Sequence, residues 1–270
     1  MLRDFLFETE CDQDRFVYHY TTAETAFDGI LQTHTLRFSP FANVNDPRES
    51  KDWQIGLAGG PGGTSSSEML LTFNAEINNA AKVKCKLLCF ATDSTDCGSN
   101  KFCTAMFSRG FSHPRMWAQY GKNHKRLCLV FDRAELSLEI QKQLGTKGKV
   151  VYAISDRREA RAFQLWYDEI YDQDVVSYSK CHIIAHRESL FFQKSMDWAA
   201  ESEYRWVFVD TIDGFVHVDF GKSLVAVVRG LDHRNTRATA KTLTDLGVRL
   251  AQMSWSNGVP MAGEYWMNRN

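Results

Sequence analysis

The sequence lacks an excess of either charge, a long apolar run and a secretory signal. Its 270 residues contain 32 Lys and Arg against 33 Asp and Glu, for a formal net charge of −1 at pH 7, so no overall charge draws the chain onto nucleic acid or an anionic membrane. It has no run of about 18 apolar residues that could span a bilayer. The start, Met1-Leu2-Arg3-Asp4, soon becomes acidic and does not resemble a signal peptide. We therefore expect a cytoplasmic protein with no membrane partner.

Common signatures of metal, phosphate and hydrolase chemistry are missing too. The pairs Cys85/Cys89 and Cys97/Cys103 are spaced irregularly for zinc. The glycine-rich stretch at 56–63 is not followed by the Gly-Lys-Ser/Thr of a P-loop, and no Gly-x-Ser-x-Gly elbow occurs. Seven cysteines without a secretory signal predict free, reduced thiols. We expect no metal in this protein.

The chain does have the composition of a globular protein, with many aromatic residues. Apolar residues make up 44% of it and aromatic residues 13%, which suffices for one packed domain over residues 1–270. Strand patterns dominate both ends and helix patterns the middle, without regular alternation. This arrangement predicts an α+β fold rather than a doubly wound parallel sheet. The one low-complexity segment, residues 56–67, is expected to be a flexible loop.

Hydrophobic periodicity gives the expected elements. A capping-box pattern, Thr21-Thr22-Ala23-Glu24, places the start of the first helix at Thr21. The expected strands cover residues 16–20, 35–39, 86–91, 126–131, 149–154, 203–209, 216–220, 224–228 and 248–253. The expected helices cover residues 21–33, 68–83, 115–120, 134–144, 157–171, 183–193 and 235–246.

The first segment with an unusual density of polar and aromatic residues is 15–21, Arg-Phe-Val-Tyr-His-Tyr-Thr. In a strand, His19 and Thr21 would share one face, just before a helix begins. A helix start offers free backbone N–H groups that suit a phosphate. A core histidine followed by an ordinary capping threonine explains the same residues.

The second segment, residues 198–208, carries Glu201, Glu203 and Arg205 at a spacing of two. If a strand begins near Glu201, these three side chains share one face. Two neighbouring carboxylates raise each other's pKa, and an arginine opposes that shift. Coupled charges of this kind occur at functional sites, although a solvated salt-bridge face would show the same pattern.

The third segment, residues 114–124, places Trp117 and Tyr120 three positions apart on one expected helix. The two rings could stack on an aromatic ligand. Packing in the core is the ordinary reason for two aromatic residues at helical spacing.

Taken in order, these segments resemble a bacterial family known as domain of unknown function 2971. The resemblance spans roughly residues 15–230 and departs from the family pattern at Arg126 and Arg229. It rests on the motifs Y-H-Y-T at 18–21, L-R-F-S at 36–39 with N-D-P-R-E at 45–49, M-W-A-Q-Y-G-K-N-H at 116–124 with C-L-V-F-D at 128–132, and W-A-A-E-S-E-Y-R at 198–205.

That family is similar to the ADP-ribosyltransferase superfamily, which implies a split β-sandwich with helices between the strands and a cleft for NAD. By this resemblance His19 would bind the adenosine ribose and contribute to catalysis. Ser39, with Phe38, would hold nicotinamide. Glu203 would be the catalytic carboxylate, and Glu201 would help to orient the acceptor. The further cofactor-binding residues that the resemblance implies are Tyr20, Thr21, Asn45, Asp46, Trp117, Tyr120 and Arg205.

The implied chemistry is cleavage of the bond between nicotinamide and ribose, which passes through an oxocarbenium-like sugar as glycoside hydrolysis does. A carboxylate beside the sugar stabilises that positive charge without a metal or a covalent nucleophile. We therefore expect an enzyme, an NAD-dependent ADP-ribosyltransferase with NAD as its substrate. Its acceptor would be a protein or a nucleic acid, its biological role that of a bacterial toxin or phage-defence effector, and its partner an antitoxin or immunity protein.

Three alternatives stay open at this point. The chain could transfer ADP-ribose to water and be an NAD glycohydrolase. It could be a non-catalytic module that binds a nucleotide or an RNA end in the same cleft. It could also be a metal-free hydrolase that uses one cysteine together with His19 or His124.

Overall fold

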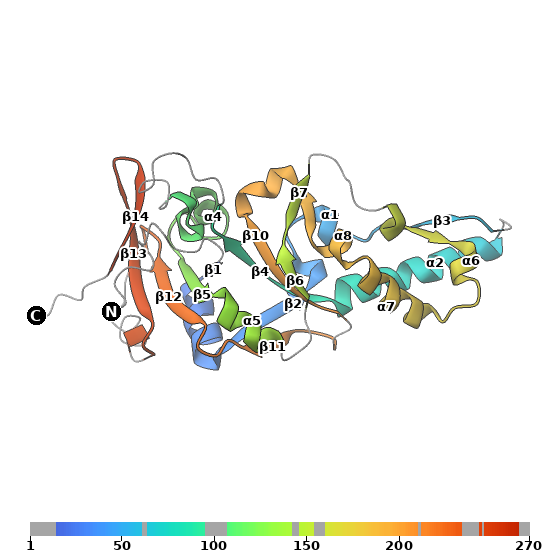
Figure 1. Ribbon diagram of the computed structural model, residues 1–270, viewed down its shortest axis with the longest axis horizontal. Helices are drawn as coiled ribbons and strands as arrows, with labels where there is room; N and C mark the ends of the chain where they lie inside the picture. The colour runs from blue at the N-terminus through green and yellow to red at the C-terminus, as the bar shows by residue number, and fades with distance from the viewer. Residues whose placement is uncertain are drawn as a thin grey trace, which may run out of the picture.

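The computed structural model describes residues 15–60, 64–94, 107–141, 146–153, 160–209, 212–233, 243–244 and 246–264. Within them the chain forms a mainly antiparallel sheet with several helices, which confirms the α+β class. In Figure 1 the sheet fills one part of an elongated molecule, and α2 (Thr64–Asn79) and α7 (Val175–Ala185) lie side by side in the other.

The main sheet of the described chain has ten strands, and most of them follow the order β11-β2-β4-β1-β5-β12-β13-β14. Strand β10 pairs with β4 and with β6, and only β12 and β13 run parallel among these neighbours. The strands are β1 (Phe16–Thr21), β2 (Thr35–Pro40), β4 (Lys86–Thr92), β5 (Leu127–Asp132), β6 (Thr146–Lys149), β10 (Glu203–Phe208), β11 (Val216–Asp219), β12 (Leu224–Arg229), β13 (Arg249–Ser256) and β14 (Val259–Glu264).

Two small parallel pairs stand apart from this sheet. Strand β3 (Gly56–Ala58) pairs with β8 (Gln164–Trp166), and β7 (Val151–Ala153) pairs with β9 (Gln193–Ser195). The helices, including short 3-10 and π segments, are η1 (Thr25–Leu31), η2 (Phe41–Asn43), α1 (Pro47–Ser50), η3 (Ala80–Lys84), η4 (Gly110–Ser112), α4 (Pro114–Gln119), α5 (Arg133–Gln141), η5 (Ala160–Phe163), α6 (Tyr167–Ile170), α8 (Arg187–Phe191) and η6 (Met196–Glu201), besides α2 and α7.

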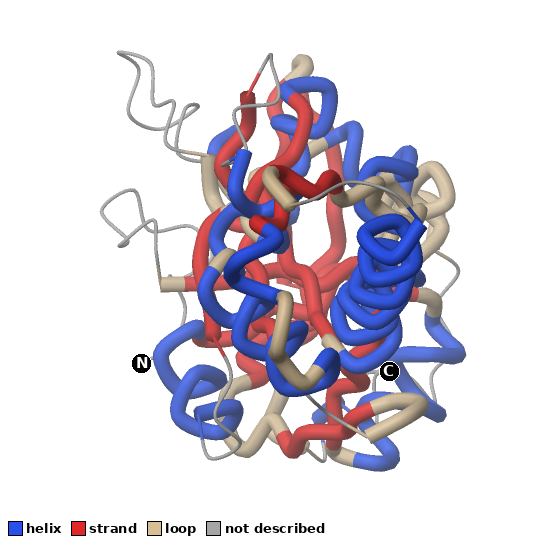
Figure 2. Tube along the Cα trace, turned by 90° about the vertical axis from the view of Figure 1, so that its right-hand side faces the viewer, coloured by secondary structure: helices blue, strands red, loops and turns tan. Residues whose placement is uncertain are grey.

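The central strands are buried on both faces. On β5, Leu129 packs in one apolar cluster and Val130 in another, as expected from strand alternation. On β1, Val17 and Tyr18 divide between the same two clusters. A third cluster lies under the helices of the other end, and Figure 2, which looks along the long axis, shows helical segments around the strands.

Strand β4 is paired unevenly, and this places the functional site. Along one edge it pairs with β10 from Lys86 to Ala91. Along the other edge β1 pairs only at Ala91 and Thr92, and β2 only at Lys86 and Leu87. Among the described strands none pairs with residues 88–90 at this edge. The sheet therefore splits between β1 and β2.

Several local expectations differ from the structure. The first helix is capped by Thr22, whose hydroxyl accepts from the N–H of Thr25 at 2.9 Å, because Thr21 still belongs to β1. The helix expected at 157–171 is wrong where described: η5, β8 and α6 follow one another, because residues 164–166 pair with β3.

The segment 56–67 also differs from the flexible loop expected there. Gly56–Ala58 forms β3, and α2 begins at Thr64, while residues 61–63 lie outside the described residues. The expected strand at 149–154 is divided between β6 and β7, and β14 was not expected at all. Most of the helix expected at 235–246 lies outside the described residues.

Gly230, which follows β12, lies against the backbone of His124. A Cβ at position 230 would meet the His124 carbonyl oxygen at 2.2 Å and its carbon at 2.6 Å, and a packed backbone cannot move aside cheaply. We expect Gly230→Ala to lower the free energy of unfolding by about 1–3 kcal/mol, the usual cost of overpacking, as measured by urea denaturation. Gly263→Ala is the matched control, because a Cβ there has no atom within 4 Å. An equal loss in both variants would contradict this packing.

Candidate functional site

A cavity of about 300 Å³ opens where β1 and β2 separate from β4. Its walls come from residues 18–20 of β1, from Ser39 and its neighbours on β2, and from residues 87–91 of β4. One end is strongly polar and is lined by Lys194, Glu201, Glu203 and Arg205. The volume lies at the lower end of the range for small-molecule sites, so the cavity would enclose only part of a dinucleotide.

Arg205 is the centre of the polar end. Its guanidinium is completely buried and binds two carboxylates at once. Glu49 accepts from Nη1 at 2.6 Å and from Nη2 at 2.9 Å, and Glu203 accepts from Nε at 2.8 Å and from Nη2 at 3.0 Å. The carbonyl of Phe191 accepts a further bond from Nη1 at 2.6 Å. Such two-point pairing fixes the planes of both carboxylates.

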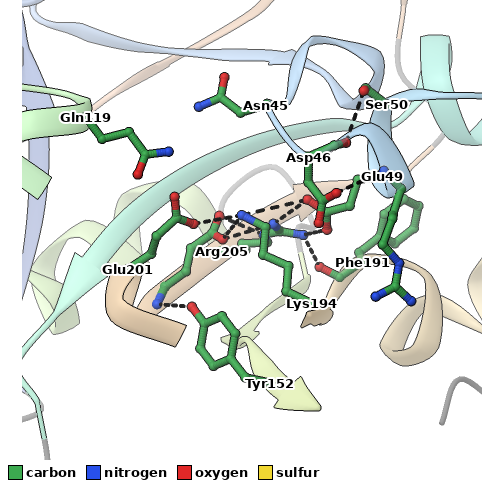
Figure 3. A network of polar contacts seen from close by, with 12 residues as sticks. Asn45, Asp46, Glu49, Ser50, Gln119, Tyr152, Phe191, Lys194, Glu201 and Arg205 are labelled. Carbon is green, nitrogen blue, oxygen red and sulfur yellow. Dashed lines mark hydrogen bonds and ion pairs between the residues drawn. The ribbon is translucent and has the colours of Figure 1, made fainter. Parts of the chain in front are cut away.

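Lys194 links Glu203 to the second acid, Glu201. Its ammonium donates to Glu201 Oε2 at 2.8 Å and to Glu203 Oε2 at 2.9 Å. Glu201 Oε1 accepts from the hydroxyl of Tyr120 at 2.6 Å, and that hydroxyl accepts from Asn45 Nδ2 at 2.9 Å. Figure 3 shows Lys194, Glu201 and Arg205 of this network close together, from separate parts of the chain.

The strand β10 and the turn before it bring the two acids together. Glu203 and Arg205 share a face of β10 because side chains alternate along a strand. Glu201 does not lie on the strand, as the sequence pattern suggested, but ends the 3-10 helix η6. Ser202 between them has a left-handed backbone with φ of 44°, and this turn brings Glu201 back beside Glu203.

The short helix α1 presents Glu49 to Arg205. Pro47 opens the helix, and Asp46 caps it by accepting from the N–H of Arg48 at 2.9 Å. The backbone carbonyl of Glu49 accepts from the buried ammonium of Lys82. The motif N-D-P-R-E therefore positions Glu49 to pair with Arg205.

Burial and pairing act against each other on these acids. Burial would raise the pKa of Glu203, but Arg205 and Lys194 outweigh it and hold that pKa at about 2. Burial raises the pKa of Glu49, although Arg205 and then Lys194, 3.9 Å away, oppose that shift. Burial also opposes the charge on Lys194, yet Glu203 and the other two acids raise the pKa of its ammonium. With all five groups ionised, the three carboxylates and two cations leave a net charge of −1.

His19 lies in the split between the strands. Its Nδ1 is 3.3 Å from the carbonyl oxygen of Cys89, and a carbonyl can only accept, so Nδ1 carries the proton and Nε2 is an acceptor. Burial lowers the pKa of His19 despite this bond. The imidazole is therefore neutral at pH 7 and is suited to accept a hydrogen bond from a hydroxyl group.

The cavity brings together most of the residues that the sequence singled out. They come from β1, β2, the segment before α1, the end of α4 and the region of β10. The cavity-lining residues among them are His19, Tyr20, Ser39, Asn45, Tyr120, Glu201, Glu203 and Arg205.

Four other expected residues do not line the cavity. Strand alternation turns Phe38 away from Ser39 into the core, where its ring packs on Phe208. Thr21 is buried at the end of β1 and pairs with Leu127. Neither Phe38 nor Thr21 lines the cavity, and their expected binding roles stay predictions.

Asp46 and Trp117 are the other two. Asp46 caps α1, the short helix that carries Glu49, and so acts on the site only through that helix. Trp117 is completely buried, packs edge-on against Tyr20 and donates from Nε1 to the carbonyl of Phe111 at 2.7 Å. Trp117 packs beneath a cavity wall, as an aromatic residue on a buried helix face ordinarily does, and its expected binding role stays a prediction.

Two members of the polar network were not among the expected site residues. Glu49 ends the N-D-P-R-E motif, so its position in that motif could have indicated it. Lys194 lies in the plain segment Gln193-Lys194-Ser195, and no local pattern marks it. Only the pairing of β9 with β7 and the turn at Ser202 place it between the acids.

Cys89 is the thiol at the cavity wall, and it is not activated as a nucleophile. Burial, and then Glu203, raise the pKa of Cys89, so its thiol stays protonated at neutral pH. Cys89, Cys128 and Cys181 are in no disulfide, and Cys11, Cys97 and Cys103 lie outside the described residues. Over the described ranges, no group of three His, Cys, Asp or Glu residues is arranged to hold a metal.

Comparison with known proteins gives one family. The model of DUF2971, a protein family of unknown function, matches residues 116–206. This match covers about a third of the chain and supports the family that the motifs indicate. It includes Tyr120, Lys194, Glu201, Glu203 and Arg205.

The DUF2971 match ends within β10, at residue 206, and does not include His19 or Ser39. No curated protein and no solved structure matches the chain. Within the described residues, no helix has the length and apolar character needed to cross a membrane.

Loss of Arg205 would leave two buried acids without their shared partner. We expect Arg205→Met to lower the free energy of unfolding by about 3–5 kcal/mol, the usual cost of breaking a buried ion pair on one side. The measurement is urea denaturation at pH 7. Arg187→Met is the control, because Arg187 is 42% exposed and lies 3.8 Å from Glu188, so it should change by less than about 1 kcal/mol. Similar losses in both variants would contradict the network.

The low pKa of Glu203 predicts a pH dependence of stability. A carboxylate whose pKa falls from 4.5 to about 2 on folding stabilises the protein above pH 4.5 and loses this contribution as the pH falls toward 2. The contribution is on the order of 3 kcal/mol. The raised pKa of Glu49 acts in the opposite direction, so the comparison must isolate Glu203.

Denaturation of the wild type and of Glu203→Gln between pH 6 and pH 2 makes that comparison. We expect the stability difference between them to shrink steadily as the pH falls below 4.5. A difference that stays constant down to pH 2 would mean that Glu203 is not held ionised by Arg205 and Lys194.

Proposed function

We propose that this protein is an NAD-dependent ADP-ribosyltransferase that modifies a macromolecular acceptor. The observation that carries the proposal is the convergence of His19, Ser39 and Glu203 on one cavity in a split sheet. These residues come from β1, β2 and β10, which lie far apart in the sequence. A split sheet with a histidine, a serine and a glutamate at these places is what the superfamily resemblance implies.

The two carboxylates at the cavity wall suit the proposed chemistry. Nicotinamide carries a positive charge in NAD, and the sugar becomes positively charged as the bond to nicotinamide breaks. The cluster of five groups has a net charge of −1 when all are ionised. Two of its carboxylates, Glu201 and Glu203, line the cavity, and Arg37 adds a positive charge to the same lining. A fixed negative charge in a site of low dielectric stabilises the developing cation without reorganisation.

The bond changes are simple. The bond between the nicotinamide nitrogen and C1′ of the ribose breaks, and its electron pair leaves with neutral nicotinamide. An acceptor nucleophile then forms a bond to C1′ and gives up its proton to a nearby base or to water. With water as the acceptor the protein would act as an NAD glycohydrolase, and this remains the second outcome of the same chemistry.

Purified protein incubated with NAD tests the proposal. We expect the wild type to release nicotinamide and the double variant Glu201→Gln/Glu203→Gln to release it at least 10²-fold more slowly, about the effect of removing well-placed electrostatic groups. The measurement is chromatography of nicotinamide, and Glu188→Gln, an exposed position, is the control.

Two results would count against the proposal. Equal rates in the wild type and the double variant would mean that the acids take no part in NAD cleavage. Calorimetric binding of NAD without any release of nicotinamide would favour a non-catalytic nucleotide-binding module in the same cavity.

A further inference from the structure

The two acids that line the cavity, Glu201 and Glu203, differ in how many hydrogen bonds they accept from the protein. Glu203 accepts from Arg205 Nε at 2.8 Å and Nη2 at 3.0 Å, and from Lys194 at 2.9 Å. An ionised carboxylate has about four lone-pair positions for donors. Three protein donors therefore take up most of the acceptor capacity of Glu203.

Glu201 has capacity left. Its carboxylate accepts from the hydroxyl of Tyr120 at 2.6 Å and from Lys194 at 2.8 Å, which fills about two of its four lone-pair positions. It also lines the cavity. A hydroxyl group of a ligand could therefore bond to Glu201 without displacing any protein donor.

The two acids also differ in how close they lie to solvent, and this difference again favours Glu201 as the ligand-binding acid. Its inner end is Arg205, which is completely buried against Glu49 and the carbonyl of Phe191. Its outer end is Tyr120, which is half-buried, and Asn45, which is exposed. Glu201 is the acid next to that outer end, and a ligand entering from solvent meets it first.

We propose, on the basis of the function proposed above, that Glu201 is the carboxylate that accepts a hydrogen bond from the ribose of NAD. Glu203 is then a positioning residue: it holds Lys194, and through Lys194 it holds Glu201. Tyr120 orients Glu201 from the other side. This assignment reverses the one that the superfamily resemblance implies, in which Glu203 meets the sugar and Glu201 orients the acceptor.

The role of Glu201 in bond breaking follows from this contact. As the bond between nicotinamide and C1′ breaks, the electron pair leaves with nicotinamide and positive charge develops on the ribose. The negative charge of Glu201, bonded to the ribose hydroxyl, stabilises that sugar. No proton needs to move in this step, and the acceptor or water later completes the new bond at C1′.

Hydrolysis of NAD without any macromolecular acceptor separates the two assignments. A residue that only orients the acceptor is dispensable when water is the acceptor, whereas a residue that stabilises the sugar is not. Nicotinamide release is therefore measured with NAD and water alone, for the wild type, Glu201→Gln, Glu203→Gln and Tyr120→Phe. Glu188→Gln and Tyr171→Phe, both at exposed positions, are the matched controls and should keep the wild-type rate.

The expected pattern has three parts. Glu201→Gln lowers kcat by at least about 10²-fold when it is assayed below its own melting temperature. Tyr120→Phe lowers kcat by about tenfold, the effect of one hydrogen bond to a charged group, with KM for NAD unchanged. Glu203→Gln lowers the melting temperature, and below that temperature its kcat falls by less than that of Glu201→Gln while KM is unchanged.

Other outcomes overturn the assignment. Glu201→Gln that hydrolyses NAD at the wild-type rate returns Glu201 to an acceptor-orienting role and leaves the proposed function intact. If Glu203→Gln does not fold, a wild-type kcat in Tyr120→Phe overturns the assignment instead. A wild type that releases no nicotinamide removes the proposed function, and the assignment with it.

Discussion

The buried guanidinium of Arg205 is the constraint on which the rest of the site depends. A completely buried cation must be paired with acids and hydrogen-bonded throughout, because an unpaired charge in this environment would cost several kcal/mol. Glu49 and Glu203 meet that need from two sides, and the carbonyl of Phe191 takes a further N–H. Once these partners are fixed, α1, β10 and the end of α8 are fixed relative to one another.

The split in the sheet leaves a cavity, and the side chains of this network line one end of it. An edge of β4 without a neighbouring strand would leave a backbone carbonyl exposed in a largely apolar interior, and His19 meets this need at Cys89. The same imidazole then presents its second nitrogen as an acceptor. Structural need and binding capacity thus coincide in one side chain, and Lys194 bridges the two acids at the polar end of the cavity.

Sequence reasoning recovered the parts of this site that depend on short-range patterns. Strand alternation placed Glu203 and Arg205 on one face, and the ordered motifs indicated His19, Ser39 and Tyr120. It could not find Lys194, because no local pattern distinguishes that residue from a surface lysine.

The local errors have the same cause, because short sequence patterns do not report contacts between residues that are far apart in the chain. The left-handed turn at Ser202 carries no glycine that would have revealed it, so Glu201 was placed on the strand. The helix expected around residue 165 gave way to a strand because a partner far away in sequence, β3, pairs with it. Pairings of this kind are tertiary and override local propensity.

A crystal structure with a non-cleavable NAD analogue tests the central claim most directly. The account predicts that the nicotinamide riboside half lies between β1 and β2, with a ribose hydroxyl within hydrogen-bond distance of Glu201 and the ion pairs of Arg205 undisturbed. An analogue bound elsewhere on the molecule, with this cavity unchanged, would contradict it.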